Sequence, residues 1–278
     1  MNETGFWNRI PLIARAIVSG ALVGLVAANI WPILLAKLDV PLAGGTEMAF
    51  LLAYIWRARG GGPPRSWKAA RAARFRTREL TGADWRWGVL AAISFAATVH
   101  AAIVLLFRLV PFPTEVFHQG YDLSFIPDRG LQLLVCVVSA ASAGICEETG
   151  FRGYMQTPIE SRHGAFVAIV TSSLLFMLVH LTKSWSQIGM VPIVFGAGVM
   201  LGLLAWASRS LVFCMIGHTI MDIGLFAYWW TQIAGTFSQR PLSETGMDRA
   251  FQVECGVFVA TLLVTLVAII RLRQLKAA

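Results

Sequence analysis

The chain has 278 residues, enough for one large domain or two ordinary ones. Hydrophobic residues make up 56% of it and charged residues 14%, against about 25% charged residues in soluble proteins, and the mean hydropathy is +0.66. This composition excludes a disordered protein, a coiled coil and a conventional cytosolic enzyme, because a water-exposed surface of this size needs more charge. The net charge of +8 does not indicate nucleic-acid binding, since the basic residues stand between apolar runs. The sequence predicts an integral membrane protein.

A transmembrane helix needs about 20 predominantly apolar residues. Eight apolar runs approach that length, so we expect an all-α polytopic bundle of about eight transmembrane helices, forming a single membrane domain over 1–278. The run 46–56 is the shortest and is the weakest prediction among them. The eight runs cover 11–36, 46–56, 87–110, 131–157, 164–181, 188–207, 211–234 and 252–270.

The basic residues are distributed unevenly between the connecting segments. If both termini are cytoplasmic, 17 of the 23 Lys and Arg residues fall in cytoplasmic segments and six in outer ones. This asymmetry follows the positive-inside rule and predicts cytoplasmic termini. Short loops and the lack of an organelle signal favour a bacterial inner membrane.

The segment 57–87 is predicted to be a basic cytoplasmic loop. It opens with a glycine- and proline-rich linker, which breaks any helix. Residues 65–78 then fit a basic helix on anionic lipid headgroups, with Trp67 and Phe75 inserted at the interface. The favoured interpretation of the loop is a topology anchor, and the alternative is a regulatory or substrate-docking loop.

Charged and polar residues inside three of the predicted spans point to function, because charge within a bilayer is costly. Glu147 and Glu148 are neighbours and diverge by about 100° on a helix, so both cannot face one reacting centre. Glu148 and Arg152 are four residues apart on one face, which favours an ion pair and leaves Glu147 for chemistry. The other two spans contain Phe176 with His180, and His218 with Asp222.

The depths of these residues test whether they can meet. At 1.5 Å per residue, Glu147 lies about 15 Å from the inner end of its span, and His218 and Asp222 about 10 and 16 Å from theirs. His180 does not fit, since counting from Gly164 places it about 24 Å deep. A buried carboxylate beside a histidine can deprotonate a water, so hydrolysis without a covalent intermediate is the favoured reaction class.

The three motifs resemble those of a known family. EExxFRG at Glu147–Gly153, FxxxH at Phe176–His180 and HxxxD at His218–Asp222 are similar, in order and spacing, to the motifs of the CPBP family. This family comprises the type II CAAX prenyl endopeptidases and bacteriocin-processing-like membrane proteases, also called intramembrane glutamic endopeptidases. The resemblance covers about 131–235, which is the expected catalytic core.

The resemblance implies a role for each residue. Glu147 would be the general base, His180 would position the water, His218 and the residue four later would stabilise the oxyanion, and Glu148 and Arg152 would support the site. The family usually has Asn at the last position. Asp222 must therefore either stay protonated or orient His218, because an ionised carboxylate cannot donate to an oxyanion. In the prenyl-processing members the substrate is a membrane-associated peptide with a lipidated cysteine near its C-terminus, and access is from the cytoplasm.

Two alternatives remain open. The carboxylate of Glu147 and the imidazoles of His180 and His218 are a ligand set that suits catalytic zinc, although the sequence has no HExxH motif. The favoured enzyme needs no cofactor. A non-catalytic protein, either a transporter with a proton relay or an immunity factor, is the alternative from another class.

Overall fold

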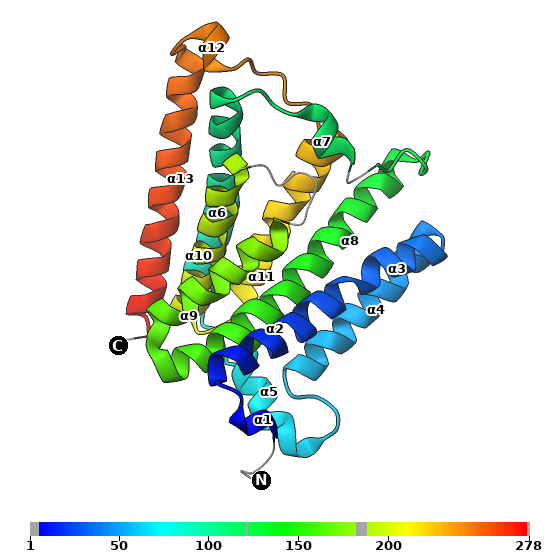
Figure 1. Cartoon of the computed structure of the whole chain (residues 1–278), viewed down its shortest axis with the longest axis vertical. Coiled ribbons are helices and arrows are strands. Elements are labelled where there is room, and N and C mark those ends of the chain that lie inside the picture. The colour runs from blue at the N-terminus through cyan, green and yellow to red at the C-terminus, as the bar shows by residue number, and fades with distance from the viewer. Residues whose placement is uncertain (1–5, 120–121, 182–187, 277–278) are drawn as a thin grey trace.

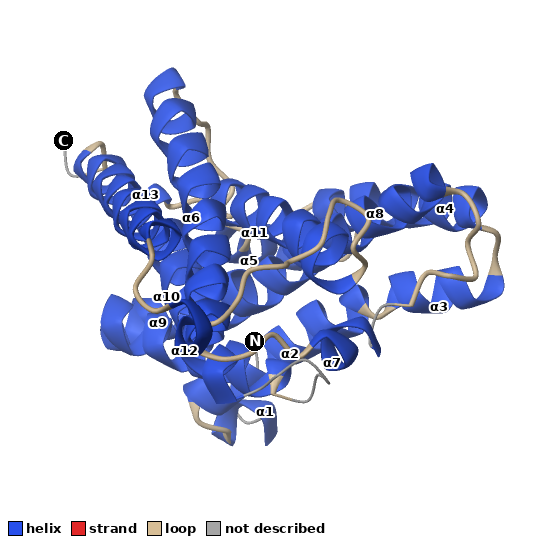
Figure 2. Ribbon diagram, turned by 90° about the horizontal axis from the view of Figure 1, so that it is seen from above, coloured by secondary structure: helices blue, strands red, loops and turns tan. Residues whose placement is uncertain are grey.

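The computed structural model of the protein describes residues 6–119, 122–181 and 188–276, and no strand occurs in these ranges (Figures 1 and 2). The predicted all-α multi-pass bundle is confirmed. The α-helices are α1 (Phe6–Arg9), α2 (Leu12–Ala28), α3 (Ile30–Lys37), α4 (Val40–Ala58), α5 (Lys68–Arg74), α6 (Gly82–Leu109), α7 (Thr114–Gln119), α8 (Arg129–Glu148), α9 (Thr157–His180), α10 (Val191–Ser208), α11 (Val212–Gly224), α12 (Leu242–Thr245) and α13 (Arg249–Gln274). Two π-helical segments, η2 (Thr149–Gln156) and η4 (Leu225–Trp230), continue α8 and α11, and the 3-10 turns η1 (Arg65–Trp67) and η3 (Ile188–Met190) precede α5 and α10.

Six helical stretches of the described chain are long and apolar enough to cross a membrane. One of them, Arg129–His180, has 52 residues and would be about 78 Å long if straight, more than twice the thickness of a bilayer core. Gly164, with a φ of 81°, breaks this stretch, which spans two of the predicted runs. The helix around 46–56, α4, is not among the six. The count of eight spans and the cytoplasmic termini therefore stay predictions.

Two helix boundaries differ from the sequence prediction for local reasons. The run predicted to begin at residue 87 begins at Gly82, because Thr81 and Asp84 form a capping box in which each side chain accepts from the other's backbone N–H. The gap predicted between residues 157 and 164 is helical, and only the left-handed backbone of Gly164 interrupts it.

The helices surround a central group formed by α8, η2, α9 and α11. On one side α6 packs along α13, α10 and α11, and on the other α2 packs against η2 and α8, with α3 and α4 outside (Figure 1). Both described chain ends and α5 lie at one end of the bundle, and α7 and α12 lie at the other (Figure 1).

Ion pairs fix the two ends of the antiparallel pair α6 and α13. Lys276 Nζ lies 2.6 Å from Asp84 at the end that holds the chain termini. At the other end Arg108 Nη2 lies 2.6 Å from Asp248 Oδ2. The backbone N–H of Phe251 and the Arg108 guanidinium hold the pKa of Asp248 at about 2, so this cap of α13 stays ionised. The two helices are therefore held together by charge at both ends.

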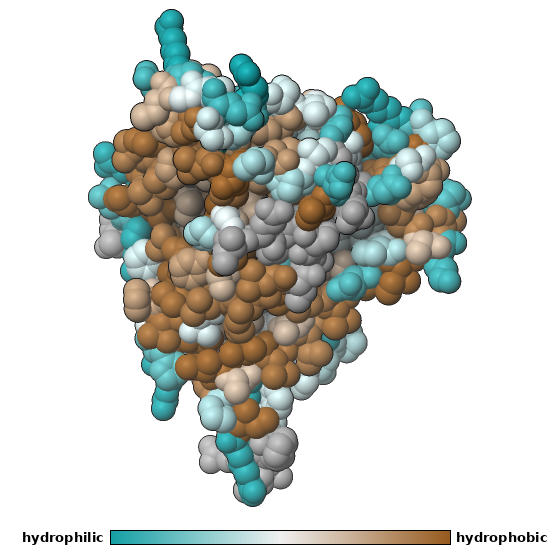
Figure 3. Space-filling model, turned by 45° about the horizontal axis from the view of Figure 1, so that its top comes forward, coloured by the Kyte–Doolittle hydropathy of each residue, from teal (hydrophilic) through white to brown (hydrophobic). Residues whose placement is uncertain are grey.

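The outside of the bundle is apolar where a membrane would surround it. Large exposed apolar side chains occur along α2, α4, α9 and α13, among them Leu22, Leu52, Phe166 and Leu263. Figure 3 shows apolar surface over the middle of the molecule and hydrophilic side chains gathered at its extremities. This surface fits a multi-pass membrane protein.

Candidate active site

The motif residues come together among α8, α9 and α11, two of which continue into π-helical segments. Glu147 and Glu148 end α8, and η2 follows them at once. His180 ends α9, while His218 and Asp222 lie in α11 just before η4. π-Helical segments are rare and are frequently found at functional sites. The structure therefore places all the predicted polar groups in one region of the central helices.

Glu147 and His180 face each other. Glu147 Oε2 lies 4.0 Å from His180 Nε2, and each side chain is 16% exposed. His180 Nδ1 donates to the carbonyl of Phe176 at 2.7 Å, which places the proton of a neutral ring on Nδ1 and turns Nε2 toward the carboxylate. A separation of 4.0 Å is too long for a hydrogen bond, whereas one water can bridge it.

This proximity corrects the depth calculated for His180. The value of about 24 Å assumed a helix upright in the membrane and starting at Gly164. The structure instead shows α8 and α9 running obliquely through the bundle (Figure 1), with a bend at Gly164 within α9. Position along an inclined helix overestimates depth, so His180 reaches the level of Glu147.

Glu148 is the centre of a fully buried network. Its Oε1 accepts from Arg152 Nη1 at 3.0 Å and from His218 Nδ1 at 2.8 Å. Arg152 Nη2 donates in turn to the carbonyl of Gly198 on α10 at 2.9 Å. These contacts join α8, η2, α10 and α11 by charge-assisted hydrogen bonds, the stronger kind. His218 thus contacts Glu148 and not Glu147.

Asp222 lies on the other side of the His218 ring. Its Oδ2 is 3.4 Å from His218 Nε2, so the imidazole stands between two carboxyl groups. Asp222 lines a cavity together with Glu147, and His218 does not. Asp222 is therefore the member of this pair that can meet a ligand next to Glu147.

Phe176 packs among the cationic and imidazole side chains. Its ring lies 4.3 Å from that of His180 and 5.7 Å from that of His218, and the Arg152 guanidinium stands 4.8 Å above it. A cation over an aromatic face is stabilised by the ring quadrupole. Phe176 therefore holds both histidines in place while Arg152 covers its face.

Two cavities meet at Glu147 and His180. The smaller, of about 100 Å³, has apolar walls from α6, α10, α11 and η4 and includes Asp222. The larger, of about 540 Å³, lies between α2, α3 and α8 and is lined partly by polar groups such as Asn29, Ser139 and Ser142. Ala143 and Phe226 border both cavities. This arrangement provides one apolar and one mixed compartment on either side of a candidate water-activating pair.

Both cavities extend from Glu147 toward the end of the bundle that carries α7 and α12. The larger one reaches Leu35 at the end of α3 and Phe125 just before α8, and the smaller one reaches Met190 at the start of α10. None of the described residues that line them belongs to the basic segment 57–87.

The ligand set of the zinc alternative does not converge. Within the described ranges, no group of three His, Cys, Asp or Glu side chains is placed to hold a metal ion. His218 has Nδ1 on Glu148 and Nε2 toward Asp222, so its ring is directed away from the Glu147–His180 pair. The geometry does not favour zinc bound by Glu147, His180 and His218.

Sequence reasoning missed a glycine contact that supports the site. A Cβ on Gly150 would lie 2.5 Å from the Gly20 carbonyl oxygen and 2.6 Å from the Gly24 Cα. Gly20 and Gly24 form a GxxxG pattern in the first apolar run, a pattern typical of close helix contacts in membranes. The GxxxG pattern can be read from the sequence, but the sequence does not show that it contacts η2.

His100 supports the backbone beside Asp222. Its Nε2 donates to the carbonyl of Met221 at 3.1 Å, and its Nδ1 accepts from Trp229 Nε1 at 3.1 Å. The ring thereby connects α6 to both α11 and η4. No motif identifies this residue, because its partners are a backbone carbonyl and a distant tryptophan.

Comparison with known proteins supports the resemblance. The family model described as type II CAAX prenyl endopeptidase Rce1-like matches residues 129–224, from the start of α8 to the end of α11. Neither the curated proteins nor the solved structures give a match. All the motif residues lie within the matched range. Residues 129–224 of this multi-pass membrane protein are thus similar to the Rce1-like type II CAAX prenyl endopeptidases, which supports the CPBP resemblance and implies a peptidase.

Proposed function

We propose that the protein is an intramembrane endopeptidase in which Glu147 activates a water for attack on a peptide bond. The observation that carries this proposal is the Glu147–His180 pair, with the two side chains 4.0 Å apart where two cavities meet. Glu147 Oε2 is buried and accepts no hydrogen bond from any described residue. A general base one water away from its partner has the geometry that proton abstraction requires.

The reaction follows from the placement of these groups. Water bound between Glu147 and His180 loses a proton to the carboxylate while its oxygen attacks the substrate carbonyl. Glu147 then passes this proton to the leaving amine as the C–N bond breaks. His180, with its proton on Nδ1, accepts a hydrogen bond from the water at Nε2 and orients it. No metal or covalent intermediate takes part in the proposed route.

We propose that Asp222, as a carboxylic acid, donates to the oxyanion. It lines the same cavity as Glu147, and a protonated carboxyl group in an apolar site can serve as such a donor. His218 would hold Asp222, and Glu148 would hold His218. Asp222 then takes the place of the Asn that is usual in CPBP proteases.

The substrate in this proposal is a membrane-associated peptide, and the cell membrane of a bacterium is the proposed location. The mixed lining of the larger cavity suits an extended peptide, whose backbone needs hydrogen-bonding partners. The apolar smaller cavity suits a hydrophobic side chain or lipid group next to the scissile bond.

The test compares wild type with Glu147→Gln, which keeps the shape of the side chain and removes its basicity. We expect a loss of cleavage of about 10²–10⁴-fold with unchanged folding, since this is what general base catalysis contributes. Substrates would be identified by quantitative membrane proteomics of the two strains and then cleaved by purified protein in nanodiscs. Retained cleavage by Glu147→Gln would exclude Glu147 as the base, and loss on chelation with rescue by zinc would favour the metal route.

A further inference from the structure

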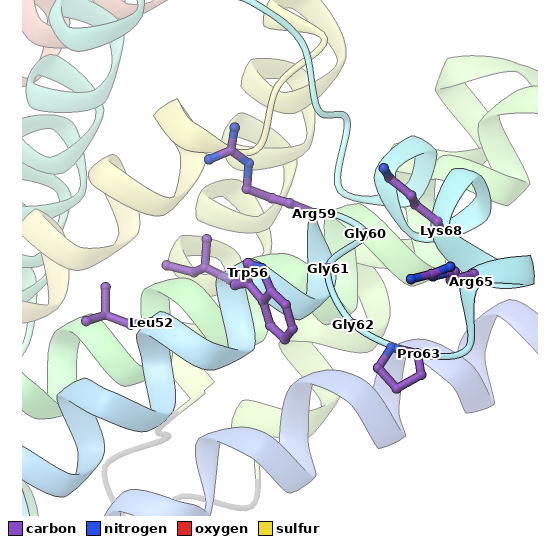
Figure 4. Close-up of a pocket in the computed structure, with 10 residues that line it drawn as sticks. Leu52, Trp56, Arg59, Gly60, Gly61, Gly62, Pro63, Arg65 and Lys68 are labelled. Atoms are coloured by element: carbon purple, nitrogen blue, oxygen red, sulfur yellow. The ribbon is translucent and has the colours of Figure 1, made fainter.

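A third pocket lies outside the candidate active site, at the end of α4. It has a volume of about 920 Å³ and is enclosed by the last turns of α4, the glycine-rich loop and the start of α5 (Figure 4). Its lining combines an apolar wall with a basic rim. The wall is Leu52, Ile55 and Trp56, and the rim is Arg59, Arg65 and Lys68.

The loop that shapes this pocket is wrapped around a buried arginine. Arg71 donates five hydrogen bonds of 2.8 to 3.3 Å to the carbonyls of residues 57, 60, 61, 62 and 64. The path requires glycine, because Gly60 and Gly62 have φ values of 103° and 66°. Because these carbonyl oxygens accept hydrogen bonds from Arg71, they are not directed at the side chains of the basic rim.

The basic rim has no acidic partner. Arg59, Arg65 and Lys68 are exposed, and none of them forms an ion pair with another described residue. Among the described residues lining the pocket there is no Asp or Glu. Figure 4 shows Arg59 on one side of the glycine loop and Arg65 and Lys68 on the other. Three cations around one concavity attract an anion.

The apolar wall is largely exposed on the outside of the bundle. Trp56 is 60% exposed and Leu52 is 64% exposed. The Trp56 ring packs on the loop so closely that a Cβ on Gly61 would lie 2.4 Å from it. Tryptophan is enriched where the hydrocarbon core meets the headgroups. The pocket therefore offers cations beside an exposed apolar surface, the combination that an amphipathic ligand requires.

We propose that this pocket binds one anionic phospholipid, with its phosphate between Arg59, Arg65 and Lys68 and its acyl chains along Trp56 and Leu52. The site is more specific than the general attraction of 65–78 for headgroups, because it combines a shaped pocket with both parts of an amphipathic ligand. The inference rests on the charge and shape of the pocket, and it holds whether or not the protein is a protease.

The experiment is native mass spectrometry of the full-length protein in detergent, titrated with phosphatidylglycerol, phosphatidylcholine or inorganic phosphate. The site variant is Arg59→Gln/Arg65→Gln/Lys68→Gln. The control variant, Arg9→Gln/Arg86→Gln/Arg162→Gln, removes the same number of exposed charges at the same end of the bundle. A charge-preserving variant, Arg59→Lys/Arg65→Lys/Lys68→Arg, and size-exclusion chromatography check the fold.

We expect one phosphatidylglycerol to bind wild type in preference to phosphatidylcholine. The site variant should lose about a hundredfold in affinity, since each basic residue near an anionic lipid contributes about fivefold. The control and charge-preserving variants should keep binding within about threefold. Equal loss in the control would reduce the site to general electrostatics. Displacement of the lipid by millimolar phosphate would make it a free-phosphate site, and either result would overturn the proposal.

Discussion

Glu147 and Glu148 are adjacent in sequence but differ in burial and in the side chains that they contact. Glu147 is partly exposed to the cavities, whereas Glu148 is fully buried with Arg152 and His218. The i, i+4 spacing predicted the contact between Glu148 and Arg152, which the structure places at 3.0 Å. No local rule could predict the bond from Glu148 to His218, 70 residues away. Replacing each glutamate with Gln should therefore have different effects: the change at Glu147 should lower cleavage, and the change at Glu148 should lower stability.

Glu148→Gln should destabilise the protein strongly. It leaves the Arg152 guanidinium, which has no solvent exposure, without a compensating charge. Breaking a buried ion pair by removing one partner costs about 3–5 kcal/mol. Thermal unfolding of purified protein would measure the loss, with Glu147→Gln as the matched control that keeps the wild-type midpoint. Equal midpoints for the two variants would contradict the role of Glu148 as the counterion of Arg152.

Asp222 offers a second test at the level of one residue. If Asp222 donates a hydrogen bond to the oxyanion, Asp222→Asn keeps a donor and should retain cleavage within about tenfold, while Asp222→Ala should lose about 10²–10³-fold. If Asp222 instead orients His218 as a carboxylate, the Asn variant should fall as far as the Ala variant. Single-turnover cleavage rates of a substrate identified as described above distinguish the two outcomes.

At the scale of elements, the contact between α2 and η2 determines how closely the first helix approaches the site. A methyl group on Gly150 would meet backbone atoms of Gly20 and Gly24 that cannot move aside. We expect Gly150→Ala to cost about 3 kcal/mol, the upper part of the usual overpacking range. Gly45→Ala is the control, because nothing lies within 4 Å of the added methyl group and alanine favours a helix. Unfolding midpoints lowered equally in both variants would contradict the close contact.

The sequence predicts the elements best where a single physical property decides them. Apolar length predicted the long helices, and the Thr81–Asp84 capping box would have moved one boundary from residue 87 to Gly82. The bend at Gly164 and the π-helical segments η2 and η4 were not predictable, because tertiary packing decides between α- and π-helical turns. Glu147 lies two residues before η2 and Asp222 lies three residues before η4. The motifs could therefore predict candidate site residues, while the contacts among them required the structure.

At the scale of the whole molecule, the two cavities at Glu147 extend away from the basic segment 57–87. The larger cavity extends from Glu147 to Leu35 and Phe125, away from the basic segment and from the end tied by Lys276 and Asp84. If the positive-inside rule sets the orientation, the basic end is cytoplasmic and the larger cavity opens toward the outer side. The resemblance instead implied access from the cytoplasm. The side on which the larger cavity opens therefore decides which substrates the proposed function allows.

Cysteine labelling with a membrane-impermeant maleimide determines that side without any need for a substrate. Asn29→Cys places a thiol in the larger cavity, Ser243→Cys marks the end of the bundle with α12, and Ser66→Cys marks the basic end. All three would be made in a Cys255→Ser background, because the other native cysteines are buried. In intact cells whose outer membrane has been made permeable, we expect Asn29→Cys and Ser243→Cys to react, and Ser66→Cys to react only after the inner membrane is disrupted.

If Asn29→Cys reacts only under the conditions in which Ser66→Cys reacts, the cavity opens on the basic side. Labelling of Ser66→Cys in intact cells would show that the orientation itself is reversed, because this thiol reports topology independently of the cavity.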